Sequence, residues 1–219
     1  MLAITFSGSG MRELTSAFVT LFVTIDPPGL APLFLALTAG MSRDERAQTA
    51  LRGTVTAFLI LLLFALAGTA ILRLFGITIH SFRIAGGLLL FWIAFEMIFE
   101  KRQQRHEKSA ETAVTVDMIR HIAVFPLAIP LIAGPGAISA TILLSGTMAT
   151  AIERLALILI VAAILGATYL ILILAERIDR LLGVMGRIVL TRLLGVLLAA
   201  LAVQFVADGV TAIARAAVD

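Results

Sequence analysis

Asp26-Pro27-Pro28-Gly29 interrupts the first long apolar stretch of this chain, and Ala133-Gly134-Pro135-Gly136 interrupts another about half the chain later. Proline removes a backbone hydrogen-bond donor, and glycine adopts conformations that other residues avoid. In hydrocarbon, the backbone groups freed in this way need protein, a ligand or trapped water as partners. Two interruptions at matching positions of two halves therefore point to the binding site of a membrane transporter.

The composition of the chain is that of a polytopic membrane protein. Of its 219 residues 60% are hydrophobic and only 14% are charged, whereas a soluble domain has about 25% charged residues. The high pI, about 10.2, comes from basic residues in short loops between apolar spans, which is a topology signal, so nucleic acid is not expected as a partner. The absence of cysteine excludes thiolate metal sites.

Six membrane spans can be placed along the chain, each near the ~20 residues that a bilayer requires. The predicted spans are about 14–39 (broken at 26–29), 53–73, 78–99, 119–148 (broken at 133–136), 155–175 and 188–213. At ~1.5 Å per residue, the residues before each break climb about 20 Å, which places both breaks near the bilayer midplane. The sequence thus predicts an all-α polytopic fold with two discontinuous helices.

The two halves also match outside the breaks. Phe82-Arg83-Ile84-Ala85-Gly86-Gly87-Leu88-Leu89 resembles Thr191-Arg192-Leu193-Leu194-Gly195-Val196-Leu197-Leu198. Because each half has three spans, an odd number, the second copy must cross the membrane in the opposite sense. We therefore predict two inverted three-helix repeats, at residues 1–109 and 110–219.

Positive residues predict the orientation of the chain. Three alternate connections hold 12 of the 17 lysines and arginines: Arg43, Arg46 and Arg52; Lys101, Arg102, Arg105, Lys108 and Arg120; and Arg177, Arg180, Arg187 and Arg192. Such a bias is typical of cytoplasmic loops. Both termini are therefore expected on the periplasmic side of a bacterial inner membrane.

Three motifs resemble signatures of the MarC family of bacterial inner-membrane proteins. They are Thr24-Ile25-Asp26-Pro27-Pro28-Gly29-Leu30-Ala31-Pro32-Leu33-Phe34, the stretch 75–91 that contains Arg83-Ile84-Ala85-Gly86-Gly87, and Pro126-Leu127-Ala128-Ile129-Pro130-Leu131-Ile132-Ala133-Gly134-Pro135-Gly136-Ala137-Ile138-Ser139. The resemblance covers nearly the whole chain, with one departure at Pro28, where the family pattern has small residues. The family is classed among six-span transporters of neutral amino acids, so the resemblance implies that function.

The chemistry of the breaks favours a zwitterionic ligand. The half-helices that begin near Gly29 and Gly136 present unpaired N–H groups and about half a positive charge, which suit a carboxylate. The half-helices that end near Ile25 and Ile132 present free carbonyls, which suit an ammonium group or a cation. Small residues around both breaks leave room for a compact side chain, which favours ligands the size of glycine or alanine. The alternative is that both breaks are architectural kinks.

The candidate substrate-binding residues lie at and just after the two breaks. They are Thr24, Asp26, Pro28, Gly29, Gly134, Pro135, Gly136, Ser139 and Thr141. A midplane carboxylate such as Asp26 is costly and by default functional, so it could bind the substrate ammonium or a coupling proton or cation. Alternatively it caps the second half-helix, and a capping carboxylate keeps spare lone pairs. The three hydroxyls could bind substrate or bond to nearby backbone carbonyls.

Catalysis and cofactor binding are not expected. A dyad of Ser139 and His121 would span about 27 Å along a straight helix, and three scattered histidines do not have the spacing of metal ligands. Glu96, late in the third span, either lies deep enough to be functional or reaches the cytoplasmic interface with Glu100 and Lys101, and the interface is the favoured position. The sequence predicts an ion-coupled secondary transporter that works by alternating access, with membrane lipids around it. The alternatives are a passive channel, an exporter of another small solute, or a membrane scaffold.

Overall fold

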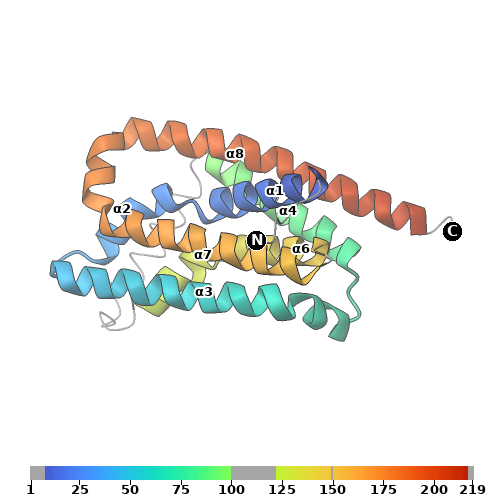
Figure 1. Ribbon diagram of the computed structural model, residues 1–219. Helices are drawn as coiled ribbons and strands as arrows, with labels where there is room; N and C mark the ends of the chain where they lie inside the picture. The colour runs from blue at the N-terminus through green and yellow to red at the C-terminus, as the bar shows by residue number, and fades with distance from the viewer. Residues whose placement is uncertain (1–7, 100–121, 149, 217–219) are drawn as a thin grey trace.

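The computed structural model describes residues 8–99, 122–148 and 150–216, and these form helices joined by short turns. The helices are α1 (Gly8–Ile25), α2 (Pro27–Leu37), α3 (Arg43–Leu74), α4 (Ile79–Ile98), η1 (Ala123–Ile132), α6 (Pro135–Thr147), α7 (Ala151–Ile173) and α8 (Ala175–Ala216) (Figure 1). No strand occurs in the described part of the chain. The predicted all-α polytopic class is confirmed.

Five stretches of helix are long and apolar enough to cross a membrane, and a bent pair makes a sixth. The five are Glu13–Leu37, Arg43–Leu74, Ile79–Ile98, Ala151–Ile173 and Arg180–Ala216, and the bent pair is η1 with α6. Each corresponds to one predicted span. Two helices extend beyond the predicted spans, since α3 begins at Arg43 and α8 begins at Ala175. Gly183, with φ of 60°, bends α8 near its start.

Capping boxes explain why α3 and α7 begin where they do. The Ser42 hydroxyl accepts a bond from the backbone N–H of Glu45, and the Glu45 side chain accepts one from the Ser42 N–H. Thr150 and Glu153 form the same reciprocal pair at the start of α7. Such a box satisfies two of the N–H groups that a helix start leaves unpaired, so each helix extends into a polar segment before its apolar span.

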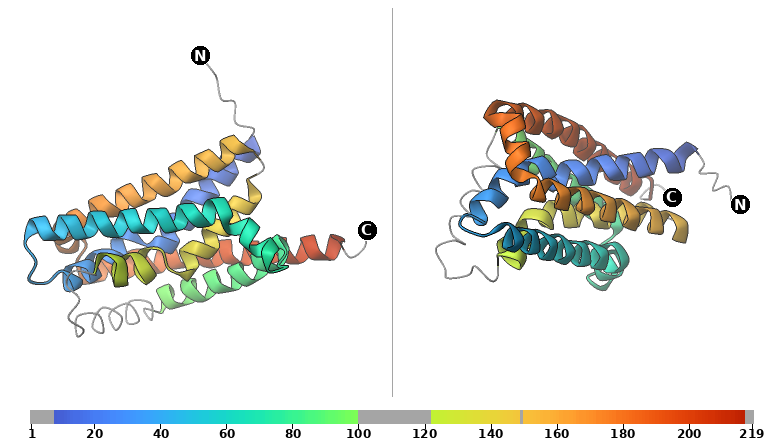
Figure 2. Two further views of the ribbon diagram at one scale, coloured as in Figure 1. Left: turned by 90° about the horizontal axis from the view of Figure 1, so that it is seen from below. Right: turned by 60° about the vertical axis from the view of Figure 1, so that its left-hand side comes forward.

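The broken spans lie inside the bundle. The first, α1 with α2, has 61% of its apolar stretch buried inside the bundle. The last span, in α8, has only 17% of its apolar stretch buried. The long helices α3, α7 and α8 lie at the outside (Figure 2) and expose apolar side chains such as Leu63, Leu159 and Leu197. An outer surface of this kind is suited to contact with hydrocarbon rather than water.

Helices α4 and α8 pack against each other along their length in opposite directions. An added Cβ at Gly195 would lie 3.0 Å from the Met97 Cβ, and one at Gly209 would lie 3.0 Å from the His80 carbonyl oxygen. Between these points, Gly87 of α4 faces Ala202 and Val206 of α8. Small residues permit such close approach of helix backbones in membranes. Gly87 therefore lets α4 and α8 approach closely, while Gly86 lies against Leu143 of α6.

Replacing Gly87 with alanine is expected to destabilise the protein by about 1–3 kcal/mol, the usual cost of overpacking. The new Cβ would lie 2.8 Å from Val206 Cγ2 and 2.9 Å from the Ala202 carbonyl oxygen, and backbone cannot move aside without separating the helices. Thermal unfolding of purified protein in detergent measures the effect. Gly166→Ala on α7 is the matched control, since no atom lies within 4 Å of its added Cβ. Equal melting temperatures for Gly87→Ala and the control would contradict the packing.

Contacts between helices repeat across the two halves of the chain. Helix α3 contacts α7, η1 and α6, while α7 contacts α3, α1 and α2. Helix α4 contacts α8 and α6, while α8 contacts α4 and α2. Exchanging the first four helices for the last four, in order, maps these contacts onto one another, whereas the contacts of α1 with α6 and α8 have no counterpart of similar extent. The boundary at 109/110 falls outside the described residues, and the division into inverted repeats stays a prediction.

Candidate functional site

The first break is one residue wide. Asp26 stands between α1 and α2 with φ of 55° and ψ of 61°, a left-handed conformation that aspartate tolerates better than most residues. Its N–H donates to the Phe22 carbonyl at 2.9 Å, and its carbonyl accepts from the Leu30 N–H at 3.2 Å. Both helices are therefore bonded to the same residue, and the break at 26–29 predicted from the sequence is reduced to Asp26.

The Asp26 carboxylate caps α2. Its Oδ1 accepts a bond from the Gly29 N–H at 3.2 Å, and an added Cβ at Gly29 would lie only 2.7 Å from the Asp26 Cγ. Glycine at position 29 therefore makes room for the carboxylate. The capping role considered from the sequence is present, and the Asp26 side chain is buried, with 6% of its surface exposed.

Two consecutive prolines change the end of α1. In a continuous helix, the carbonyls of Val23 and Thr24 would accept from the N–H groups of residues 27 and 28, but Pro27 and Pro28 have none. The carboxyl end of α1 thus presents carbonyl oxygens, with their partial negative charge, in a buried part of the bundle. Val23 and Thr24 are both buried.

The second break is wider and sharper. Helix η1 is a wide helix in which the N–H groups of Leu127 and Ala133 donate to carbonyls five residues earlier, and Pro126 and Pro130 follow cis peptide bonds. After Ala133 and Gly134 the chain turns by 58° into α6. The predicted span before this break begins at about residue 119, outside the described residues, and within its described part Pro126 and Pro130 prevent regular α-helical bonding.

The amino end of α6 has no side-chain cap. Gly134 occupies the capping position, Pro135 is the first helical residue, and the next N–H groups belong to Gly136 and Ala137. This end differs from the start of α2, where a carboxylate occupies the equivalent place. Of the two helix starts expected to attract a ligand carboxylate, α6 is the one without a carboxylate cap of its own.

The two breaks meet at Thr24 and Gly136. An added Cβ on Gly136 would lie 3.1 Å from the Thr24 Cγ2 and 2.3 Å from the Ile93 Cδ1. The carboxyl end of α1 and the amino end of α6 therefore touch, with a side chain of α4 against them. The expectation that small residues leave open space here needs correction, since Ile93 fills it. Sequence reasoning missed Ile93, because only the tertiary fold brings α4 to the breaks.

The predicted hydroxyl ligands differ in their environment. The Thr24 hydroxyl donates to the Thr20 carbonyl at 2.6 Å, and the Thr141 hydroxyl donates to the Ala137 carbonyl at 2.7 Å. Both are buried and bonded to their own helices, as the alternative interpretation of the sequence held. Ser139 is half-buried on α6.

The remaining candidate residues surround the meeting point. Pro28 and Gly29 are half-buried in the first turn of α2, and Pro135 is exposed. Gly134 packs on the chain before it, since an added Cβ would lie 2.5 Å from the Pro130 carbonyl oxygen. The structure thus brings Thr24 and Gly136 into contact, with Asp26 two residues further along the chain.

Glu96 is buried inside the bundle. It is only 6% exposed and is one helical turn along α4 from Ile93, the residue that covers Gly136. Glu96 lies in the last turn of α4, and its expected position at the cytoplasmic interface stays a prediction.

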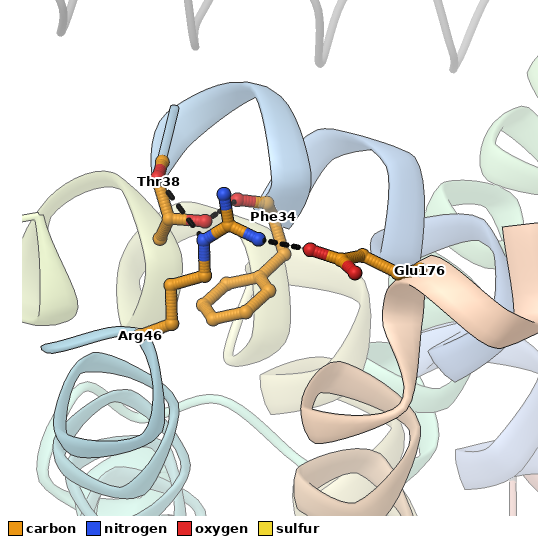
Figure 3. A network of polar contacts seen from close by, with 4 residues as sticks. All are labelled: Phe34, Thr38, Arg46 and Glu176. Carbon is orange, nitrogen blue, oxygen red and sulfur yellow. Dashed lines mark hydrogen bonds and ion pairs between the residues drawn. The ribbon is translucent and has the colours of Figure 1, made fainter. Parts of the chain in front are cut away.

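An arginine anchors each helix that follows a broken span. Arg46 on α3 donates through Nε to the Thr38 carbonyl at 3.4 Å, at the end of α2, and through Nη1 to Glu176 on α8 (Figure 3). Arg154 on α7 donates through Nε to the Met148 carbonyl, also at 3.4 Å, at the end of α6. Both helix starts share a sequence pattern that the sequence analysis did not use. A hydroxyl residue is followed three positions later by Glu-Arg, in Ser42 with Glu45-Arg46 and in Thr150 with Glu153-Arg154.

Known proteins resemble this chain over almost its whole length. Residues 11–214 match the profile of the MarC family integral membrane protein. The chain belongs to the MarC family. Its relatives include a UPF0056 membrane protein of Archaeoglobus fulgidus, 42% identical with 89% of this chain and 90% of the relative covered. The UPF0056 membrane protein YhcE of Escherichia coli is 39% identical, with 90% and 91% covered. No solved structure matches the chain.

The arrangement in this MarC-family chain can bind a positive and a negative group that belong to the same small molecule. Carbonyls at the end of α1 attract a cation, and N–H groups at the start of α6 attract an anion. Among the described residues, no group of three histidine, aspartate or glutamate side chains is placed to hold a metal ion. His121, considered with Ser139 as a dyad, lies outside the described residues.

Proposed function

We propose that this MarC-family protein is a secondary transporter that moves small neutral amino acids of the glycine and alanine class across the bacterial inner membrane. The observation that supports this proposal is the contact between Thr24 and Gly136, where the carboxyl end of α1 meets the uncapped amino end of α6 inside the bundle. Broken helices that meet inside a membrane protein are a recurring design of transporter sites.

Each end of the substrate would have its own partner. The carboxylate would accept bonds from the N–H groups of Gly136 and Ala137, which the partial charge of α6 favours. The ammonium group would donate to the carbonyls of Val23 and Thr24 and to the carboxylate of Asp26. A carboxylate has about four acceptor sites, so Asp26 can keep its bond to Gly29 and accept another.

The close packing of the site favours a substrate with a very small side chain. Ile93 lies against Gly136 and would have to move by one rotamer to admit a ligand. Alternating access, in which one half moves against the other around the site, would give the ligand a path from each side. Asp26 is our candidate for the coupling proton or cation, and the charge bias of the loops supports periplasmic termini.

Counterflow in proteoliposomes tests the proposal. Purified protein is reconstituted with internal unlabelled alanine, and the entry of radiolabelled glycine or alanine is followed with and without an imposed pH gradient. Saturable exchange that needs internal substrate is expected, and the pH gradient should drive accumulation. No movement of either amino acid in vesicles that contain folded protein would refute the amino-acid assignment.

Cysteine labelling separates a transporter from a passive channel. The chain has no native cysteine, so single cysteines can be placed around the two breaks without further changes. A transporter is expected to expose these positions to one side at a time, in a way that substrate changes. Simultaneous access from both sides would favour the channel.

A further inference from the structure

Arg154 and its repeat counterpart Arg46 have the same local anchor but different surroundings. Each follows a capping box and donates through Nε to the last carbonyl of the preceding helix. Arg46 then meets a carboxylate, because Glu176 of α8 reaches its Nη1. Arg154 has no carboxylate within salt-bridge distance among the described residues. It lines a cavity of about 390 Å³ instead.

The cavity is cationic. It lies where α3 ends and α4 begins, against the end of α6 and the start of α7. A second arginine, Arg73 in the last turn of α3, lines it together with Arg154. The described lining residues include the hydroxyls of Thr69, Thr78 and Ser145 and no acidic side chain. Two guanidinium groups without a carboxylate beside them in the described part of the chain suit a phosphate group, whose oxygens guanidinium binds by paired N–H bonds. The Ser145 hydroxyl donates to the Ala65 carbonyl and the Thr78 hydroxyl donates to the Ser81 Oγ, so the two arginines are the main partners for a phosphate.

Exposed apolar side chains lie next to Arg73 in the chain. Leu74 and Phe75 directly follow this lining residue and are 84% and 73% exposed. The cavity lies where α3 ends at Leu74 and α4 begins at Ile79, and both helices are long and apolar enough to cross a membrane. We therefore expect the cavity near the level where hydrocarbon gives way to headgroups, where a bound lipid could lay its acyl chains on these side chains.

We propose that the cavity between Arg73 and Arg154 binds the phosphate group of an anionic glycerophospholipid. The headgroup phosphate lies beside Arg154 as the Glu176 carboxylate lies beside Arg46. Arg46 is then neutralised by a side chain of the protein, and Arg154 is neutralised by a lipid of the bilayer. The site is separate from the two helix breaks, and the proposal does not depend on amino-acid transport.

Binding of lipid to the full-length protein in detergent tests the proposal. Short-chain phosphatidylglycerol and phosphatidylcholine are titrated separately, and native mass spectrometry counts the bound lipid. Saturable binding of one phosphatidylglycerol is expected, weaker at high salt because the charges face water in part. Arg73→Gln should weaken it by about tenfold or more, since one of two charged partners is lost. Arg154→Gln should act similarly.

Arg215→Gln is the matched control. Arg215 is an exposed arginine in the last turn of α8, and α8 runs beside the start of α4 at Gly209, so the control removes the same charge at the same end of the bundle. Arg73→Gln decides the result, because Arg154 also holds the end of α6. Equal phosphatidylglycerol binding by Arg73→Gln and Arg215→Gln would overturn the site.

A titration with soluble phosphates shows whether the bound phosphate group belongs to a lipid. Glycerol phosphate and inorganic phosphate are titrated into lipid-depleted protein, with binding followed by calorimetry. Saturable binding that Arg73→Gln removes would keep the phosphate site but overturn its assignment to lipid. Absence of soluble binding, together with phosphatidylglycerol binding that needs Arg73, supports the lipid assignment.

Discussion

Replacing Asp26 with asparagine is expected to leave the fold intact and to lower the rate of glycine exchange about 10- to 100-fold. Asparagine accepts the left-handed conformation and can cap α2 through its side-chain oxygen. It lacks the negative charge that would bind the substrate ammonium, and bonds to charged groups contribute about 1.5–3 kcal/mol. Counterflow and thermal unfolding, measured on the same preparation, separate the two effects.

Two further variants define the role of Asp26. Asp26→Ala should lose stability as well, by about 1 kcal/mol for the cap and a further 1–2 kcal/mol for the left-handed backbone. Asp208→Asn removes a carboxylate from an exposed position on α8 and should exchange glycine like the unaltered protein. Full exchange by Asp26→Asn would mean that the carboxylate serves only as a cap.

Replacing Gly136 with alanine is expected to abolish transport and to destabilise the protein by about 1–3 kcal/mol. The added methyl group would lie 2.3 Å from the Ile93 Cδ1 and 3.1 Å from the Thr24 Cγ2. It would force the ends of α1 and α6 apart and cover the N–H groups proposed to hold the substrate carboxylate. Exchange assays and unfolding in detergent measure the two effects.

The clash with Ile93 makes a sharper test. Ile93→Val removes the Cδ1 atom and alone should cost about 0.5–1.5 kcal/mol. In the double variant the alanine methyl group occupies the vacated space, so the two changes should compensate with a coupling energy of about 1 kcal/mol or more. Strictly additive losses would show that the side chains of positions 93 and 136 do not meet. Gly166→Ala again serves as the control.

The sequence was sufficient to place the spans and both breaks, because a proline–glycine pair within a long apolar stretch removes helical hydrogen bonds that hydrocarbon cannot replace. It also contained the difference between the breaks, since Asp26 precedes Pro27 whereas Gly134 precedes Pro135, and of these two residues only aspartate has a side chain that can cap a helix. Helices α3 and α7 begin before the predicted spans, because the length of an apolar stretch marks a span whereas the capping boxes of Ser42 and Thr150 decide where the helix begins.

Other parts of the site could not be predicted from the chain alone. Ile93 covers Gly136 only because α4 packs beside α6, and no local pattern around either residue shows this contact. The cavity beside Arg154 likewise depends on Arg73, which comes from a different helix. The wide turns of η1 arise from Pro126 and Pro130 together, and a single span length does not reveal them.

The two junctions differ as mechanical joints. At Asp26 both flanking helices are bonded to one residue, and its own side chain ties it to the next turn, so α2 can pivot on α1 only by rotating one pair of dihedral angles. At Ala133 and Gly134 there are two linking residues and no side-chain tie. The second junction is therefore the more flexible. If one half moves against the other, we expect the chain to bend first between η1 and α6. Helices α1 and α2 would then move together as one rigid unit.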